Sequence, residues 1–137
     1  MTRLVVDASA AISWFVVSQS GQRSTAFEPQ LVEYELIAPD VFAWEMANLF
    51  RRFALAGALE FDSAIAVLDE LGIAFSRSRS AREISSLAPL ALDLGLSLFD
   101  AAYLALAVES DAELVSRDRT LLTAARAHAI PCHDLND

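Results

Sequence analysis

The sequence contains no lysine, because all ten of its basic residues are arginine. This absence excludes every mechanism that requires a lysine side chain. Positive charge is scarce overall: 19 acidic residues stand against the ten basic ones, and the formal net charge of the 137-residue chain is −9. An acidic protein repels nucleic acid at long range, so general coating of DNA is not expected. The charge balance favours binding of divalent cations or of a basic partner.

Cysteine and long hydrophobic runs are also scarce. Cys132 is the only cysteine and has no partner for a disulfide within the chain, as is typical of proteins in a reducing cytoplasm. No hydrophobic run reaches the roughly 18 residues of a membrane span, and the first residues lack the hydrophobic core of a signal peptide. We therefore expect a cytoplasmic protein without membrane contact.

Hydrophobic residues, in contrast, make up 55% of the chain, which indicates a folded domain with a substantial core. Short hydrophobic runs that predict strands alternate with longer segments that predict helices. The predicted strands are residues 4–6, 35–39, 73–75, 114–116 and 130–133, and the predicted helices cover residues 10–16, 41–56, 61–71, 97–108 and 119–127, with one more ending near residue 94. This alternation predicts an α/β fold with a central parallel sheet of four to five strands and a single domain over residues 1–137.

The first predicted strand ends in an acid. Leu4, Val5 and Val6 are consecutive hydrophobic residues, which predicts a strand buried on both faces, and Asp7 stands at its carboxyl end. Ser9 follows at the start of the next predicted helix. Because ligands bind at the carboxyl ends of strands in open α/β sheets, Asp7 is a candidate functional residue. The alternative is that Asp7 only caps the helix.

Three later acids occupy comparable places, each at a strand end or in the first turn of the following helix. Glu45 lies one turn inside the helix predicted over 41–56, Asp100 stands in the first turn of a hydrophobic helix, and Asp118 follows the strand predicted at 114–116. Each has a structural alternative. Glu45 fits a solvated helix face, and Asp100 and Asp118 fit helix caps.

The joint placement of the four acids is more informative than any one of them. The carboxyl ends of parallel strands lie along one edge of a sheet, so the four side chains are predicted to converge there. Crowded carboxylates raise one another's pKa unless a cation lies between them. Oxygen ligands without His or Cys favour Mg²⁺ or Mn²⁺ over Zn²⁺. Such a site suits phosphodiester hydrolysis, in which the metal lowers the pKa of a water molecule and stabilises charge on the phosphate.

Four stretches that contain these acids are specific when taken together. They are residues 7–9 (Asp-Ala-Ser), 39–48 (PDVFAWEMAN), 99–107 (FDAAYLALA) and 116–119 (SRDR). In order and spacing they closely resemble the PIN-domain ribonucleases, in particular the VapC toxins of bacterial toxin–antitoxin pairs, over essentially the whole chain. The resemblance implies a three-layer PIN-like fold, with helices on both sides of the parallel sheet.

The resemblance also implies a set of site residues. The positions that match the metal-binding acids of the family are Asp7, Glu45, Asp100 and Asp118. Ser9 and Ser116 match the hydroxyl positions beside the first and last acids, and Asn48 matches an Asn that is common after the helix Glu. The implied protein is an endoribonuclease that uses Mg²⁺ or Mn²⁺ and a metal-activated water on single-stranded or looped RNA. Its implied partners are a second copy in a homodimer and a small VapB-type antitoxin that silences it.

Arginine and aromatic side chains complete the candidates. The only dense basic segment contains Arg77, Arg79 and Arg82, which could contact flanking RNA phosphates; the alternative is a solvated Ser/Arg loop. Trp14, Trp44 and Tyr103 could stack nucleobases. Each fits a helical hydrophobic pattern, however, so core packing is the favoured interpretation.

Other protein classes fit the sequence less well. A receiver domain also has an acidic edge, but it needs a lysine there and adjacent acids after the first strand. A haloacid-dehalogenase-type phosphatase needs a second Asp at position 9, where this chain has Ser9. Structure-specific DNA nucleases are generally longer and carry added helices. The alternative that stays open is a catalytically silent scaffold whose acidic edge binds a protein partner, and the complete set of four acids argues against it.

Overall fold

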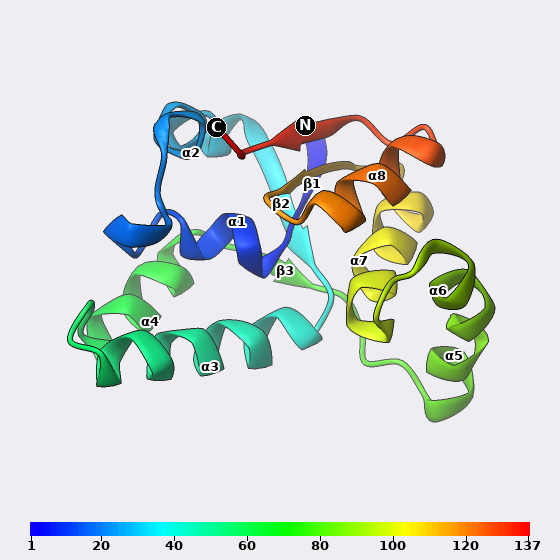
Figure 1. The fold of residues 1–137 in the computed structure, drawn as a ribbon, viewed down its shortest axis with the longest axis horizontal. Coiled ribbons are helices and arrows are strands. Elements are labelled where there is room, and N and C mark those ends of the chain that lie inside the picture. The colour runs from blue at the N-terminus through cyan, green and yellow to red at the C-terminus, as the bar shows by residue number, and fades with distance from the viewer.

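A five-stranded parallel sheet forms the centre of the computed structural model, which describes residues 1–137 (Figure 1). The strands are β1 (Thr2–Val6), β2 (Tyr34–Ala38), β3 (Ala74–Phe75), β4 (Glu113–Ser116) and β5 (Cys132–Asp134). Their order across the sheet is β3-β2-β1-β4-β5, and every neighbouring pair is parallel. The α/β prediction with a parallel sheet is therefore confirmed, and the number of strands is five.

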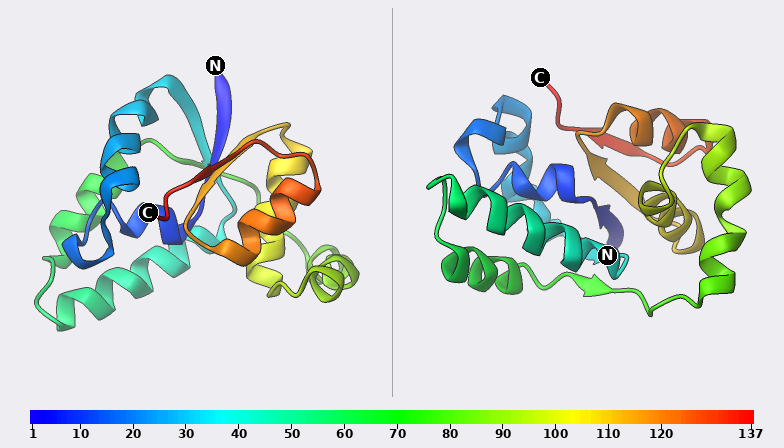
Figure 2. Two further views of the ribbon diagram at one scale, coloured as in Figure 1. Left: turned by 45° about the horizontal axis from the view of Figure 1, so that its top comes forward. Right: turned by 60° about the horizontal axis from the view of Figure 1, so that its bottom comes forward.

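Helices connect the strands and cover both faces of the sheet, as Figures 1 and 2 show. They are α1 (Ala8–Ile12), α2 (Gln22–Phe27), α3 (Val41–Leu55), α4 (Phe61–Glu70), α5 (Ala81–Ser86), α6 (Ala88–Leu94), α7 (Leu98–Glu109) and α8 (Arg119–Ala127), with short 3₁₀ helices at Val17–Gln19 and Glu28–Glu33. α1 packs against α3, and α7 packs against α8. Right-handed crossovers place the helices on the two faces of the sheet, because the chain runs from β1 outward to β3 and then returns to β4 and β5 on the other side of β1.

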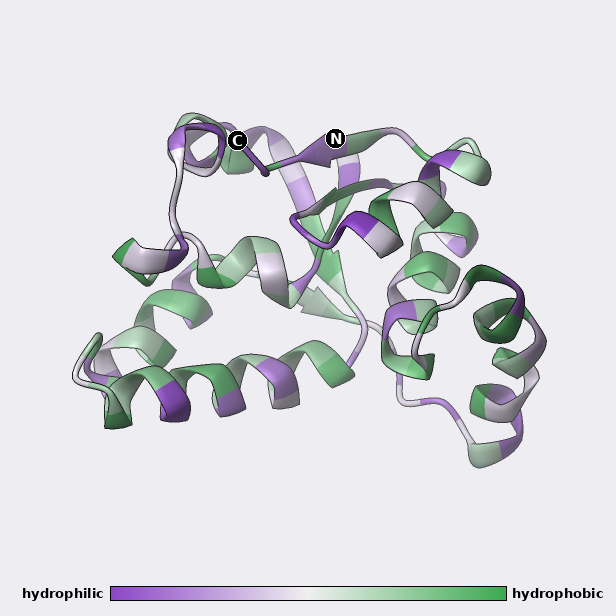
Figure 3. Cartoon of the chain, viewed as in Figure 1, coloured by the Kyte–Doolittle hydropathy of each residue, from purple (hydrophilic) through white to green (hydrophobic).

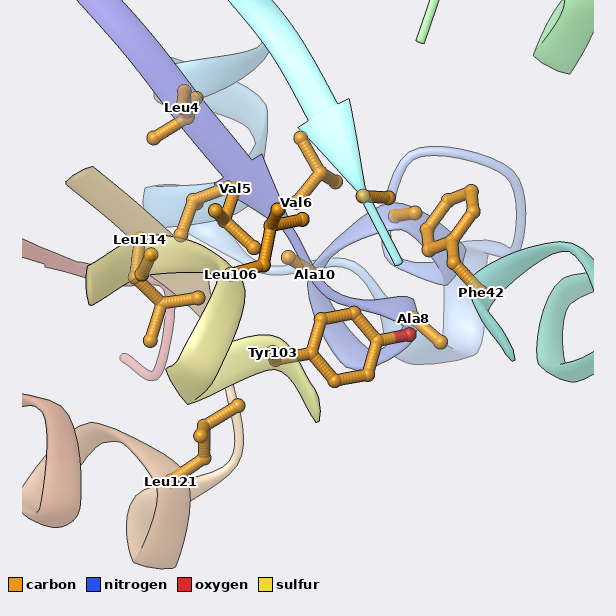
Figure 4. Close-up of a cluster of buried hydrophobic side chains, with 14 of the residues drawn as sticks. Leu4, Val5, Val6, Ala8, Ala10, Phe42, Tyr103, Leu106, Leu114 and Leu121 are labelled. Atoms are coloured by element: carbon orange, nitrogen blue, oxygen red, sulfur yellow. The ribbon is translucent and has the colours of Figure 1, made fainter. Parts of the chain in front are cut away.

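The centre of the sheet is also the centre of the hydrophobic core. Leu4, Val5 and Val6 are fully buried, which confirms the prediction of a strand covered on both faces. Figure 4 shows them in one cluster with Phe42 of α3 and Tyr103 of α7, and Figure 3 shows that the central strands and most of α7 are hydrophobic. The sheet order changes direction between β1 and β4, so their carboxyl ends form the topological switch point where ligands bind in such sheets.

Two helices differ from their predicted extents. α1 ends at Ile12 rather than near residue 16, and its cap is Asp7 rather than Ser9, because the Asp7 carboxylate accepts the Ala10 N–H. The helix predicted to end near residue 94 is divided into α5 and α6. Pro89 stands in the first turn of α6, where its missing N–H costs no helical hydrogen bond.

The core-packing prediction is right for Tyr103 and wrong for Trp44. Tyr103 is 1% exposed, whereas the side chain of Trp44 is 80% exposed. The buried face of α3 consists of Phe42, Met46 and Phe50, which recur every fourth residue and so lie on one side of the helix. Trp44 falls midway between Phe42 and Met46 in sequence and therefore points away from that side.

Helix length and hydropathy bear on the expectation of no membrane contact. No single helix is both long and hydrophobic enough to cross a membrane. The segments Ala81–Leu94 and Leu98–Glu109 reach the required length and hydropathy only when taken as a pair, and the chain bends by 101° between them.

Candidate active site

Asp7 is the only buried acid of the chain, with 4% of its surface exposed. Its backbone N–H reaches across to β4 and donates to the Val115 carbonyl at 3.4 Å, so the carboxyl ends of β1 and β4 are joined at this point. Its carboxylate accepts hydrogen bonds from three donors. Ala10 N–H donates to Oδ1 at 2.9 Å, Ser9 Oγ donates to Oδ1 at 2.8 Å, and Ser116 Oγ donates to Oδ2 at 2.6 Å. The carboxylate is thereby held in one orientation.

Burial raises the pKa of Asp7 from its ordinary value of 3.8 to about 6. The hydrogen bonds from Ser116, Ala10 and Ser9 oppose this rise, whereas the negative charge of Asp118 adds to it. The charge of Arg117 lies close enough to interact with Asp7, but no basic side chain forms an ion pair with this carboxylate. Asp7 is therefore a buried carboxylate that three hydrogen bonds hold in place without an ion-pair partner.

Ser116 links Asp7 to the fourth acid. Its hydroxyl donates to Asp7 and accepts the Asp118 backbone N–H at 2.9 Å. Asp118 begins α8 as its N-cap, with Oδ1 accepting the Leu121 N–H at 3.1 Å. The cap interpretation of Asp118 is thus correct, and the cap places this carboxyl beside the end of β1.

Glu45 and Asp100 lie half-buried on the facing ends of α3 and α7. Tyr103 Oη donates to Glu45 Oε1 at 2.6 Å and so ties the two helices together. Burial raises the pKa of Glu45, and the charge of Asp100 raises it further. Burial likewise raises the pKa of Asp100, with the charge of Asp118 as a second cause. Ser97, the first residue of the helix predicted over 97–108, is the N-cap of α7 and accepts the Asp100 N–H.

These electrostatic effects connect all four acids, which we call the acidic edge: Asp7, Glu45, Asp100 and Asp118. Asp118 acts on Asp7 and on Asp100, and Asp100 acts on Glu45. Their oxygen donors are those that Mg²⁺ and Mn²⁺ prefer. As the side chains stand, however, no group of three or more His, Cys, Asp or Glu residues is gathered closely enough to hold a metal ion. Repulsion between like charges keeps carboxylates apart, and a divalent cation would remove that repulsion.

The other predicted residues lie outside this network. Asn48 is exposed one turn after Glu45 and has no hydrogen bond to any of the acids. In the basic segment, Arg77 is paired with Glu83 at 2.8 Å and Arg79 with Glu109 at 2.6 Å. Arg82 is exposed and unpaired. Two of the three arginines proposed for RNA contact are thus already engaged with acids.

Arg117 is a residue whose part the sequence did not indicate. Its Nε donates to the Ser9 carbonyl at 2.7 Å, Nη2 donates to Gln19 Oε1 at 3.0 Å, and Nη1 donates to the Gln19 carbonyl. Its backbone N–H donates to Ser9 Oγ at 2.9 Å. Arg117 therefore holds Ser9, and with it Asp7, against the end of β4.

We expect Arg117→Ala to lower the free energy of unfolding by about 2–3 kcal/mol, because it removes charge-assisted hydrogen bonds to half-buried carbonyl groups. Urea unfolding followed by circular dichroism measures this change. Arg119→Ala is the matched control, since Arg119 is exposed and unpaired, and its effect should stay within about 0.5 kcal/mol. Equal stabilities of the two variants would contradict the assigned contacts.

Known proteins resemble this chain in sequence and in fold. The PIN domain family model matches residues 4–127. Ribonuclease VapC3 from Pyrobaculum aerophilum is 33% identical over 122 residues, a match that covers 87% of this chain and 92% of that protein.

Solved structures share the fold at lower identity. PAE2754 from Pyrobaculum aerophilum has a TM-score of 0.70 and 20% identity, with 91% of this chain and 86% of that chain covered. FitAcB from Neisseria gonorrhoeae has a TM-score of 0.58 and 17% identity, with 96% of each chain covered. These structures show the three-layer arrangement alone. The family match and the identity to VapC3 go further: the chain belongs to the PIN-domain family and is of the VapC type.

Proposed function

We propose that this protein is a metal-dependent endoribonuclease and the toxin of a VapBC toxin–antitoxin pair. The observation that carries the proposal is the buried carboxylate of Asp7, which is held by three donors at the switch point of the sheet. The charge of Asp118 acts on it directly, and Asp100 and Glu45 are linked to Asp118 in turn. Membership of the PIN-domain family and the identity to a protein named as a ribonuclease support it.

The four acids have distinct positions in the proposed mechanism. Asp7 and Asp100, with Glu45, would hold the main Mg²⁺ or Mn²⁺, and Asp118 would complete the site. When bound, the cation supplies a water of lowered pKa and stabilises negative charge on the phosphate. Hydrolysis breaks the bond between phosphorus and the 3′ oxygen and leaves a 5′-phosphate, as the family resemblance implies.

Hydrogen bonds from neighbouring residues orient these acids. Ser9 and Ser116 fix both oxygens of Asp7 through their hydroxyl groups. Tyr103 performs the same task for Glu45. Groups that hold ligands in this way typically change activity by about 10- to 100-fold when removed. The acidic edge is thus supported by hydroxyl donors, which add no positive charge that would compete with a cation.

RNA contacts and protein partners are also part of the proposal. Arg82 is free to meet an RNA phosphate, whereas Arg77 and Arg79 would have to exchange their acidic partners to do so. Family membership leads us to propose a homodimer silenced by a VapB-type antitoxin. Exposed Phe61 and Val67 on α4 support a dimer contact through α3 and α4. In the silent-scaffold alternative the acidic edge would bind a protein partner without turnover, and cleavage of RNA distinguishes the two.

Incubation of the purified protein with total RNA tests the proposed function. We expect discrete RNA fragments with Mg²⁺ or Mn²⁺ and intact RNA with EDTA, because the acids alone carry no positive charge to bind phosphate. Sequencing of the fragment ends identifies the target. Intact RNA under every condition, together with no metal binding by calorimetry, would favour the scaffold.

Tyr103→Phe is expected to lower the cleavage rate by about tenfold without unfolding the protein. The change keeps the ring that fills the core and removes only the hydroxyl that donates to Glu45. Because that hydrogen bond lowers the pKa of Glu45, its loss raises this pKa further. The acidic limb of the pH–rate profile then moves to higher pH. An unchanged rate and an unchanged profile would show that Glu45 needs no support from Tyr103.

A further inference from the structure

A cavity of about 630 Å³ opens between the first turns of α3 and α7, and we call it the Trp44 pocket. Its lining is mainly hydrophobic and includes Trp44, Ile84, Leu98 and Phe99. Small-molecule sites are typically about 300–1,000 Å³ in volume, with a few polar groups among hydrophobic ones. The pocket has the size and the lining of a ligand site.

The two aromatic walls of the pocket are unusual for a surface. Trp44 is 80% exposed and Phe99 is 61% exposed, so both large aromatic side chains lie outside the core. Trp44 directly precedes Glu45 in α3, and Phe99 directly precedes Asp100 in α7. Each aromatic residue therefore directly precedes an acid of the acidic edge, and the pocket adjoins the N-terminal parts of α3 and α7 that also carry Glu45 and Asp100.

Positive charge contributes little to RNA binding in this protein. The net charge is −9, Arg77 and Arg79 are paired with acids, and Arg117 is turned inward to Ser9 and Gln19. Contacts that do not depend on positive charge would therefore add to the affinity for RNA. Stacking of bases on exposed aromatic rings is such a contact, and it tolerates any base sequence.

The polar groups of the pocket suit the edge of a base. The Asp40 carboxylate is an acceptor, the Ser97 hydroxyl is both donor and acceptor, and the Arg79 guanidinium is a donor held in place by Glu109. Unpaired bases in RNA are recognised by this combination of an aromatic surface and hydrogen bonds along the base edge. The Asp40 carboxylate also accepts the Ser78 hydroxyl at 3.0 Å, so both charged groups are held in place by the protein and retain further hydrogen-bonding capacity for a ligand.

We propose that the Trp44 pocket binds one unpaired nucleobase next to the phosphate to be cleaved, stacked against Trp44 and Phe99. The inference rests on the proposed ribonuclease function and adds a substrate requirement to it. A base held in a helical stem cannot enter the pocket, since its edge and both its faces are already occupied. The protein therefore selects single-stranded or looped RNA through this pocket, in addition to any selection at the acidic edge.

Tryptophan fluorescence tests the pocket without any need for cleavage. The chain has two tryptophans, and Trp14 lies elsewhere, with its Nε1–H donating to the Ser24 carbonyl at 3.0 Å. In an Asp7→Asn background, Trp14→Phe leaves Trp44 as the only emitter, and Trp44→Phe leaves only Trp14. We expect a short single-stranded RNA of mixed sequence to quench the first protein strongly and the second hardly at all. The same RNA annealed into a duplex should quench neither.

Kinetics on the otherwise unchanged protein provide the second readout. Trp44→Ala should raise KM for single-stranded RNA by about tenfold with little change in kcat, because stacking contributes to binding rather than to bond breaking. Trp44→Phe should recover most of the loss. Leu92→Ala is the matched control, since Leu92 is 82% exposed but lies on α6 away from the pocket lining.

The outcomes separate the pocket from the proposed function. RNA cleavage by the wild type together with unchanged Trp44 emission would overturn the pocket and leave the nuclease intact. Quenching of Trp44 without any cleavage would support the pocket and overturn the nuclease. If Trp44→Ala instead changes the oligomeric state in sedimentation, and RNA leaves Trp44 emission unchanged, then a second copy covers the pocket and the nucleobase proposal is wrong.

Discussion

Asp7→Asn is expected to reduce RNA cleavage by at least about a thousandfold while the protein stays folded. The amide has nearly the same shape as the carboxyl, and its oxygen can still accept the Ala10 N–H that begins α1. The substitution removes the one negative charge that is buried at the switch point between β1 and β4. Without that charge, binding of a divalent cation loses its central ligand.

The loss of cleavage is measured by incubating equal amounts of each purified protein with the same RNA and Mn²⁺. Glu60→Gln is the matched control, because Glu60 also caps a helix, accepting the Ser63 N–H at 2.7 Å, but lies at the start of α4 outside the acidic edge. That variant should cleave at the wild-type rate. Equal cleavage by Asp7→Asn and the wild type would mean that the activity comes from a contaminating nuclease or from another site.

The metal-free protein is expected to lose stability through Asp7 as the pH rises from 4 to 7. The pKa of this carboxyl is raised from 3.8 to about 6 by folding, so the folded protein binds the proton more tightly than the unfolded chain. The resulting contribution of about 3 kcal/mol is complete below pH 4 and is lost as the pH passes through 6. Burial acts in the same direction on Glu45 and Asp100.

The difference between wild type and Asp7→Asn isolates this contribution. Carboxyls with a lowered pKa, such as Glu83 and Asp134, make the protein more stable as the pH rises. Their contributions are the same in both proteins and cancel in the difference. Urea unfolding in EDTA at each pH should show Asp7→Asn as the more stable protein at pH 7, with the two converging near pH 4. Parallel curves for the two proteins would contradict the raised pKa.

Added Mg²⁺ should reverse the loss at neutral pH. A ligand that binds only the folded protein stabilises it by about 2.7 kcal/mol at one hundred times its dissociation constant. The rise in melting temperature should be present in the wild type at pH 7, weaker at pH 5 where Asp7 is protonated, and absent in Asp7→Asn. A melting temperature that does not respond to Mg²⁺ would argue against a cation site at the acidic edge.

The sequence was sufficient to predict the positions of the acids but not the contacts that hold them. Strand ends and helix starts follow from local patterns, and those patterns alone assign Asp7 and Asp118 to the edge of the sheet. The bond from Tyr103 to Glu45 joins residues 58 apart, and the bond from Arg117 to Ser9 joins residues 108 apart. Such pairs depend on how helices lie across the sheet, and local patterns contain no information on that.

Trp44 illustrates a second limit. α3 carries hydrophobic residues on more than one side, because Trp44 and Leu55 are exposed while Phe42, Met46 and Phe50 are buried. A helix of this kind offers two hydrophobic faces, and its sequence does not state which of them meets the sheet. The second hydrophobic face of α3 therefore explains both why Trp44 was assigned to the core and why it lines an exposed pocket.

The central place of β1 determines when the acidic edge can exist during protein synthesis. β1 is made first, yet its neighbour β4 follows much later, as Leu4 pairs with Glu113, 109 positions further on. A ribosome-bound chain that stops before β4 carries Asp7 but lacks Ser116, which holds the Asp7 carboxylate from the other side. Sheets built from such distant pairs form late in folding. The growing chain therefore lacks a finished site until β4 has emerged, and the ribosome that makes it meets no assembled edge before then.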